Sequence, residues 1–391
     1  MNPPTSSWRT DWLPSALFGV FSLLTSVTMF WLPVYFSEEL GYSGAQIGSI
    51  FAFQALAFAL ASVPAGLGND RIRSRTLALV ALAAQSVFLL AMGYVKSFPA
   101  FLLVFSGWAF MYNTLRLTME MQLLKHDAGD RTSNRIALFV AWRFGGIAVG
   151  MIMAAMLLTA FDFQWTFRVL AGVTLLLLIP ALALPPTRVK RQAMKSYVRD
   201  LLTPRVILFI GWLFLFTTHW GVEQTCYGLF LRRNLGLNLQ QMGGYMAAEF
   251  VAVIAVVLLV GRRLVDPKAP HLLIVVFALI LSGVGHLGMI IDNPWISVLF
   301  RMIHGFGDGT IMVVLYLGVT RLFHVERLGG NAGVINLAMT AGMVAGAIVA
   351  APAGEYFGYE HPIWISGVVL LLLGIPLVVR HVRSKANADS G

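Results

Sequence analysis

Twelve long apolar runs constrain this sequence more than any other feature. Each run is about 20 residues or longer, which is the length that an α-helix needs to cross the hydrocarbon core of a bilayer. The runs lie at residues 12–36, 46–67, 76–95, 98–124, 136–159, 164–184, 206–230, 241–260, 271–291, 294–323, 329–354 and 362–380. Hydrophobic residues make up 58% of the chain and charged residues 12%, whereas soluble domains are about 25% charged. The sequence therefore predicts an all-α polytopic membrane protein with twelve transmembrane helices.

Basic residues gather in alternate loops between these runs. If both termini lie inside, 21 of the 28 Lys and Arg residues fall near inner ends and only Lys96, Arg232 and Arg233 fall in outer loops. This asymmetry follows the positive-inside rule, so the net charge of +10 predicts membrane topology and no nucleic-acid partner. We expect cytoplasmic termini. Since the sequence has no Asn-x-Ser/Thr glycosylation acceptor, a bacterial inner membrane is favoured.

The chain also repeats itself at an offset of 195 residues. The matched positions are Leu40, Gly41, Gln46 and Gly48 with Leu235, Gly236, Gln241 and Gly243, and, after a slip of one residue, Gly146 and Gly150 with Gly342 and Gly346. Matches at glycine and glutamine in loops are harder to obtain by chance than matches between apolar helices. We expect an N-terminal six-helix bundle at 1–184, a basic cytoplasmic linker at 185–205, and a C-terminal six-helix bundle at 206–391.

Two parallel six-helix repeats resemble the architecture of the major facilitator superfamily of secondary transporters. The segment GLGNDRIRSR resembles the signature loop of this family, and the matching positions are Gly66, Asp70, Arg71 and Arg75. Gly68 and Arg73 depart from the pattern. The resemblance implies alternating access around a central cavity, with Asp70 and Arg71 acting in gating. The alternative is a basic loop that only sets topology.

The run at 294–323 carries charges that a membrane helix normally excludes. Arg301, His304 and Asp308 are spaced i, i+3 and i+7, which places them on one stripe of a helix near the membrane midplane. The stretch also resembles a second family motif, with His304 in place of Gln. We predict that Asp308 carries a proton or substrate, tuned by His304 and Arg301. The alternative is an internally neutralised packing network, and the glycines at 305, 307 and 309 favour close helix packing in either case.

A second stripe has the same spacing, at Asn113, Arg116 and Glu120. We predict that Arg116 binds an anionic group of the substrate, with Asn113 beside it. The alternative is that Arg116 and Glu120 pair along their own helix.

The run at 206–230 places His219, Glu223 and Tyr227 on one face, and the segment HWGVEQTCYG favours a local break in the helix. Glu223 is predicted to bind a proton, with His219 and Tyr227 near the substrate. Glu249 stands alone in its run, and it is predicted either to bind a proton or to act as a neutral hydrogen-bonding partner. His286 is also alone, and we expect a core histidine there.

These features predict proton-coupled symport of a small polar or anionic solute, such as a sugar, a nucleoside or an organic acid, by a monomer. The alternatives are a proton-coupled antiporter that exports drugs, sugars or metabolites, and a non-transporting sensor. The absence of Pro from RFGGIAVG disfavours the antiporter. The sequence has no catalytic or nucleotide-binding motif, and a single cysteine, Cys226, allows no Cys-based zinc site. We therefore expect no enzyme activity, cofactor or metal.

Overall fold

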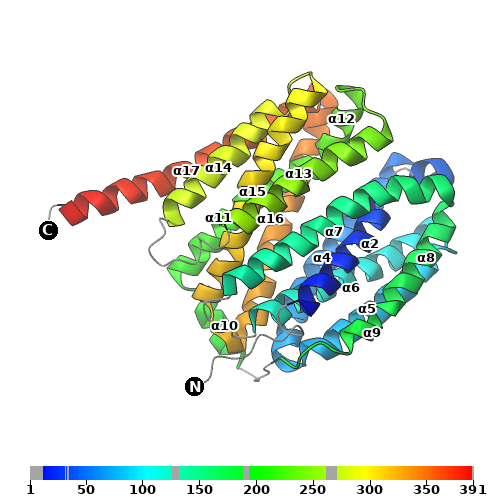
Figure 1. Cartoon of the computed structure of the whole chain (residues 1–391), viewed down its shortest axis with the longest axis horizontal. Coiled ribbons are helices and arrows are strands. Elements are labelled where there is room, and N and C mark those ends of the chain that lie inside the picture. The colour runs from blue at the N-terminus through cyan, green and yellow to red at the C-terminus, as the bar shows by residue number, and fades with distance from the viewer. Residues whose placement is uncertain are drawn as a thin grey trace. The chain divides into compact units, whose positions relative to one another are not determined.

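The computed structural model describes residues 12–30, 32, 35–125, 132–187, 193–260 and 271–389, and the regular structure in these ranges is entirely helical. A helix occupies each of the twelve predicted runs (Figure 1). Eleven of the helices are long and apolar enough to cross a membrane, while the apolar helix at Leu13–Met29 is shorter. The prediction of an all-α polytopic protein is confirmed.

Packing divides the chain into two compact units, one formed by Met1–Ile207 with Val319–Thr340 and the other by Leu208–Gly318 with Ala341–Gly391. The first contains α2 (Leu13–Phe30), η1 (Tyr35–Glu39), α4 (Gly44–Arg71), α5 (Ser74–Met92), α6 (Phe98–Leu124), α7 (Thr132–Ala160), α8 (Phe163–Leu176), α9 (Leu178–Ala181), α10 (Met194–Leu201) and η5 (Val325–Arg327). The second contains η3 (Glu223–Tyr227), α12 (Gly228–Arg233), α13 (Leu239–Val260), α14 (His271–Gly288) and α17 (Glu360–Asp389). Both units share α11 (Pro204–Val222), α15 (Pro294–Leu322) and α16 (Leu328–Phe357).

The sequence repeat has a counterpart in the backbone. Gly41 and Gly236 both adopt a φ of 64°, a left-handed conformation that glycine reaches without steric cost. Two residues further on, Ser43 and Asn238 each accept a hydrogen bond from the backbone N–H three residues later, at 3.3 and 2.9 Å. The same turn and the same helix cap therefore begin α4 in the first unit and α13 in the second.

A second repeated feature is a close helix–helix contact made by glycine. A Cβ atom on Gly146 of α7 would lie 2.0 Å from the carbonyl oxygen of Gly19 on α2. In the second unit, a Cβ on Gly342 of α16 would lie 2.2 Å from the carbonyl oxygen of Phe214 on α11. Small residues let membrane helices approach closely, and here they do so at matching positions of the repeat.

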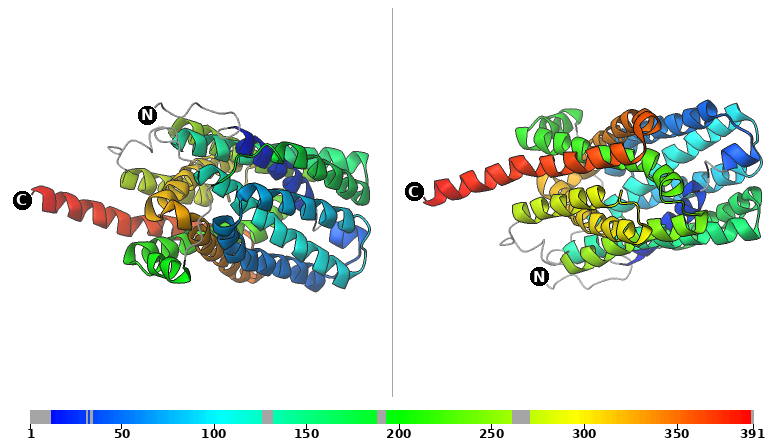
Figure 2. Two further views of the ribbon diagram at one scale, coloured as in Figure 1. Left: turned by 90° about the horizontal axis from the view of Figure 1, so that it is seen from below. Right: turned by 90° about the horizontal axis from the view of Figure 1, so that it is seen from above.

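The second unit has an apolar core between α11, α14, α15 and α17. Its buried members are Phe216, Ala278, Leu279, Ile311 and Leu370. α17 packs along α14 and continues past its end as one helix (Figures 1 and 2). This core lies beside the polar residues that α11, α14 and α15 contribute to the candidate site.

Candidate functional site

Glycines on α15 bring three helices of the second unit close together. A Cβ on Gly305 would lie 2.6 Å from the carbonyl oxygen of Glu249 on α13, and one on Gly307 would lie 2.4 Å from that of Ala278 on α14. The predicted role of these glycines in close packing is confirmed. Because α13, α14 and α15 approach closely at Gly305 and Gly307, polar side chains from the three helices can contact one another.

Arg301 on α15 joins two carboxylates that come from different helices. Its guanidinium forms ion pairs with Glu223 on η3 and Glu249 on α13, and its Cζ lies 4.3 Å from the ring centroid of Tyr227. Only 2% of Arg301 is exposed. A planar guanidinium can bind both carboxylates and stack on an aromatic ring at once, which an ammonium cannot do.

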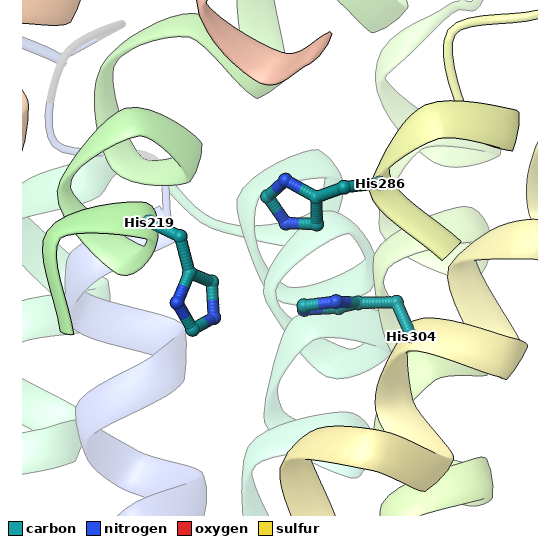
Figure 3. Close-up of side chains that lie close together, drawn as sticks. All are labelled: His219, His286 and His304. Atoms are coloured by element: carbon teal, nitrogen blue, oxygen red, sulfur yellow. The ribbon is translucent and has the colours of Figure 1, made fainter. Parts of the chain in front are cut away.

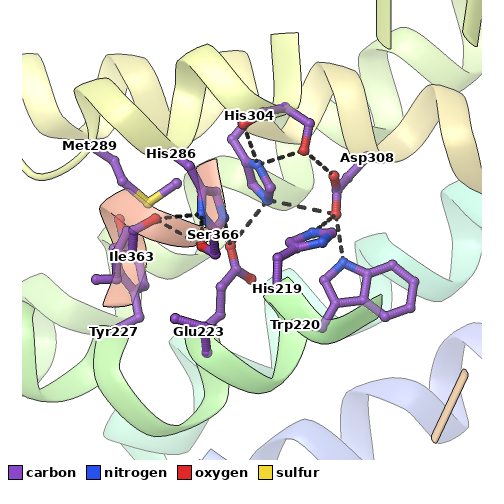
Figure 4. Close-up of polar contacts among 12 residues, drawn as sticks. His219, Trp220, Glu223, Tyr227, His286, Met289, His304, Asp308, Ile363 and Ser366 are labelled. Carbon is purple, nitrogen blue, oxygen red and sulfur yellow. Dashed lines mark hydrogen bonds and ion pairs between the residues drawn. The ribbon is translucent and has the colours of Figure 1, made fainter. Parts of the chain in front are cut away.

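Asp308 lies one helical turn beyond His304 on α15, and side chains from α11 and α14 contact its carboxylate (Figure 4). Its Oδ2 lies 2.6 Å from Nε1 of Trp220 and 3.1 Å from Nε2 of His219, both on α11. Its Oδ1 accepts a hydrogen bond of 2.7 Å from the hydroxyl of Ser282 on α14. Asp308 is therefore held by α11 and α14 while it belongs to α15.

Three histidines complete this group, and each has its Nδ1 against a backbone carbonyl oxygen. The acceptors are the carbonyls of Phe216 for His219, Ile363 for His286 at 3.3 Å, and Ser282 for His304 at 3.1 Å. A carbonyl oxygen can only accept, so each Nδ1 carries the proton and each neutral ring presents a bare Nε2.

The Nε2 atoms of all three rings face carboxylate oxygens. Nε2 of His286 and of His304 lie 2.9 and 3.1 Å from Oε1 of Glu223, and Nε2 of His219 faces Asp308. A lone pair facing a carboxylate oxygen is repulsive unless a proton or another cation lies between them. We define the charge cluster as Glu223, Glu249, Asp308, Arg301, His219, His286 and His304.

The charge cluster contains more acidic than basic charge. Its three carboxylates carry three negative charges when ionised, and Arg301 is the one permanent cation that contacts them in the described part of the chain. Two more positive charges neutralise the group, and neutrality is strongly favoured in a buried volume. The arrangement can therefore bind two protons or one divalent cation.

The π-helix η3 places Glu223 in the charge cluster and Tyr227 beside its Arg301. It lies between α11 and α12, where the sequence predicts a break, and π-turns within helices occur frequently at functional sites. The Tyr227 hydroxyl donates to that of Tyr245 at 2.8 Å, and Tyr245 lies 2.5 Å from the hydroxyl of Ser297. This hydroxyl chain joins η3, α13 and α15 beside Arg301.

The second predicted stripe lies in the first unit. Arg116 donates to Oδ1 of Asn113 from Nε and Nη2, and it pairs with Glu120 at 3.0 Å. The pairing of Arg116 with Glu120 along their own helix is confirmed. Asn336 of α16 donates 2.7 Å to Ser62 and 3.3 Å to Asn113, and the sequence did not predict its presence here.

Asp70 of the signature loop accepts four hydrogen bonds, all within the first unit. Its Oδ1 accepts from Nζ of Lys125 at 2.7 Å and from the backbone N–H of Gly329 at 3.0 Å. Its Oδ2 accepts from the N–H of Gly330 at 2.7 Å and the hydroxyl of Tyr197 at 3.1 Å. Asp70 thus binds the N-terminus of α16, where the helix dipole favours a carboxylate.

The other signature residues lie around this contact. A Cβ on Gly66 would lie 2.3 Å from the carbonyl oxygen of Gly329, so α4 and α16 touch there. Arg71 is exposed, and Nη1 of Arg75 lies 3.4 Å from the carbonyl oxygen of Leu182.

Comparison with known proteins identifies the family of this chain. The sequence model of the Major Facilitator Superfamily matches residues 15–273 and 226–390. The chain belongs to this superfamily. No curated protein matches the sequence. Among solved structures, the superfamily fold is shared with the human organic anion transporter MFSD10 (TETRAN), at a TM-score of 0.75 and 17% identity over 94% of this chain and 99% of that one. It is also shared with the superfamily transporter FucP in the outward conformation, at a TM-score of 0.71 and 13% identity over 93% and 97% of the two chains.

As a member of the major facilitator superfamily, the protein is a multi-pass membrane transporter and not an enzyme. The structure brings seven of the predicted site residues into one contact network: Asp308, Glu223, Glu249, His304, Arg301, His219 and Tyr227. Asn113 and Arg116 lie together in the first unit. Their roles in proton and substrate binding stay predictions.

Glu249 is not isolated, as the sequence suggested, because it pairs with Arg301. His286 is a buried core histidine, as expected, but it is not alone, because it contacts Glu223. Trp220 and Ser282, which both contact Asp308, were missed. Their spacing from His219 and His286 along the same helices is the one signal in the sequence that could have identified them.

The linker helix α10 of this superfamily member lies outside the apolar runs and contacts the start of α16. Burial, together with the charge of Asp70, raises the pKa of Tyr197 to about 12, so its hydroxyl remains a donor. Burial raises the pKa of Asp200, but hydrogen bonds from Arg327 at 2.6 Å and Asn331 at 3.1 Å outweigh it, and the net pKa is lowered.

Proposed function

We propose that this transporter is a proton-coupled symporter that takes up a small polar or anionic organic solute by alternating access. The observation that carries the proposal is the buried excess of two negative charges in the charge cluster. A transporter couples to protons when a group gains or loses them as its surroundings change. The charge cluster supplies such groups.

Two places in the charge cluster suit protons. One is the contact between His219 and Asp308, at 3.1 Å. The other is Oε1 of Glu223, which faces Nε2 of both His286 and His304. A proton at each place would remove the repulsion between lone pair and carboxylate and would bring the charge cluster to neutrality. Histidine suits this task because its unperturbed pKa is close to physiological pH.

The class of solute follows from the buried polar residues. Arg116 and Asn113 offer a guanidinium and a carboxamide in the first unit, and Tyr227 and Arg301 offer a hydroxyl and a guanidinium in the second. These groups suit carboxylates, phosphates or hydroxyl-rich molecules. Sugars, nucleosides and organic acids are therefore the proposed substrates, a class consistent with the organic anions named for the similar structure of MFSD10.

Gating is proposed for the signature loop. Asp70 binds the N-terminus of α16 through two backbone N–H groups, and it is also bound by Lys125 and Tyr197. Opening on this side would require Asp70 to leave the helix N-terminus. The distribution of basic residues supports a cytoplasmic location for this side and for both termini.

The test is to reconstitute the full chain in lightly buffered vesicles and record external pH while adding sugars, nucleosides, carboxylates and cationic drugs in turn. We expect external alkalinisation with one compound class, lost in Asp308→Asn but kept in Asp292→Asn, which changes an exposed carboxylate between α14 and α15. External acidification on adding a compound would instead establish the antiporter. Solute uptake without any pH change would reject proton coupling.

A further inference from the structure

Three histidines from three different helices converge in the second unit. His219 belongs to α11, His286 to α14 and His304 to α15, and Figure 3 shows their rings directed toward one another. One ring nitrogen of each lies within 4.8 Å of those of the other two. The sequence predicted no metal because no local spacing joins these residues, which are separated by 67 and 18 positions in the printed numbering.

The surroundings of these rings match those of metal-binding histidines. Histidine ligands usually donate the hydrogen on the second ring nitrogen to a carbonyl or carboxylate, which fixes the ring and leaves the first nitrogen bare. Here Nδ1 of each ring lies against a carbonyl oxygen. Ser366 supports this assignment, since its hydroxyl donates to the carbonyl of Ile363 and therefore accepts from Nδ1 of His286 at 2.7 Å.

Glu223 offers a fourth ligand beside two of the three rings. Oε1 of Glu223 lies 2.9 Å from Nε2 of His286 and 3.1 Å from Nε2 of His304. In a tetrahedral site with bonds of about 2.1 Å, neighbouring ligand atoms are separated by about 3.4 Å. Because the histidine nitrogens lie within 4.8 Å of one another, they would draw together by up to about 1.4 Å, which rotation of the side chains can supply.

The charge of the site also suits a divalent ion. Glu223, Glu249 and Asp308 outweigh Arg301 by two negative charges. One divalent cation neutralises this excess. Imidazole and carboxylate ligands together favour a borderline transition metal over Mg²⁺ or Ca²⁺, which prefer all-oxygen sites.

We propose that His219, His286, His304 and Glu223 bind one divalent transition-metal ion, with Zn²⁺ as the best fit. The site goes beyond proton-coupled transport and does not depend on it, since metal binding requires neither a solute nor a proton gradient. If the transporter is also proton-coupled, Zn²⁺ and protons compete for the same Nε2 atoms, and the ion inhibits uptake.

The experiment uses the full chain without a histidine tag, stripped of metal and purified in detergent. Titration calorimetry with ZnCl₂ should give one ion per chain. His286→Gln and His304→Gln should each weaken binding by about tenfold or more. His361→Gln is the matched control, because the side chain of His361 is 59% exposed and lies outside the charge cluster.

Titration with Co²⁺ provides a second measurement that does not depend on any variant. Four-coordinate Co²⁺ absorbs visible light far more strongly than the hydrated ion, so the wild type should develop strong absorption that Zn²⁺ then abolishes. No binding to the wild type, absorption typical of the hydrated ion, or equal Zn²⁺ affinity in properly folded His286→Gln, His304→Gln and His361→Gln would overturn the proposal. Zinc binding without a pH response in vesicles would reject proton coupling alone.

Discussion

Nε2 of His286 lies 2.9 Å from Oε1 of Glu223, although the two residues come from separate helices. His286 has no exposed surface, and its Nδ1 donates to Ser366 on a third helix. The ring is thus held from one side and presents its other nitrogen to a carboxylate. This geometry leads to the first prediction.

His286→Gln should lower proton-driven accumulation of the solute by about tenfold or more, equivalent to about 1.4 kcal/mol of coupling. A glutamine can still hydrogen-bond to Glu223, but it cannot take up a proton. Exchange of labelled solute across the membrane without a gradient should continue. The measurement is accumulation against exchange in the same vesicles, and full uphill accumulation by His286→Gln would contradict the proton-binding role.

Arg301→Lys should destabilise the protein, and Arg301→Met should do so more strongly. Losing one partner of a buried ion pair costs about 3–5 kcal/mol, and lysine retains only part of the contact because it cannot bind Glu223 and Glu249 with one planar group. In thermal unfolding in detergent, the wild type should have the highest melting temperature, Arg301→Lys an intermediate one and Arg301→Met the lowest. Arg205→Lys, at an exposed position, serves as the control. Equal melting temperatures for wild type and Arg301→Lys would contradict the double ion pair.

Asp200→Asn should reduce stability by no more than about 1 kcal/mol at neutral pH, because the ion pair with Arg327 is partly exposed. The pKa of Asp200 is lowered in the folded protein, so its contribution is present above the unfolded value of about 3.9 and is lost as pH falls through the lower folded value. The difference in melting temperature between wild type and Asp200→Asn should therefore be constant from about pH 5 to 8 and shrink below about pH 4. If the difference in melting temperature between wild type and Asp200→Asn grows on acidification, the pKa of Asp200 is not lowered in the folded protein.

Gly146→Ala should destabilise the contact between α7 and α2 by about 1–3 kcal/mol, because the added Cβ would lie 2.0 Å from the carbonyl oxygen of Gly19. Gly172→Ala on α8 is the matched control, since a Cβ there meets no atom within 4 Å. Thermal unfolding of both variants gives the comparison. If the two substitutions have equal effects, the close approach does not contribute to stability.

Most of the fold follows from local patterns in the sequence. Apolar runs long enough to span a membrane predicted a helix in each of the twelve places where the structure has one. The matched glycines at 41 and 236 lie in turns that adopt the same φ. These features are readable because each depends on residues that are close in sequence. Helix ends shifted by several residues in places, and the run at 164–184 is divided between α8 and α9.

The candidate site was predictable only where it follows one helix. Arg301, His304 and Asp308 form a stripe on α15 that spacing alone identifies. Glu249 and His286 were misjudged because no other acidic or basic residue lies within one helical turn of either, and their partners lie on other helices. Which helices pack together, and at what rotation, is decided by tertiary contacts such as those of Gly305 and Gly307. The sequence predicted a break in the helix near Glu223, but it did not predict that the break takes the form of a π-helix, whose turns are wider than those of an α-helix.

The ion pairs of the charge cluster also have a mechanical consequence. Arg116 pairs with Glu120 on its own helix, so a movement of α6 leaves this ion pair intact. The charges of Arg301 and Asp308, by contrast, are shared among η3, α11, α13 and α15. Sliding any of these segments past another would leave a buried charge without its counterion, at a cost of several kcal/mol. We therefore expect these segments to resist sliding past one another and to move together in any conformational change of this part of the transporter.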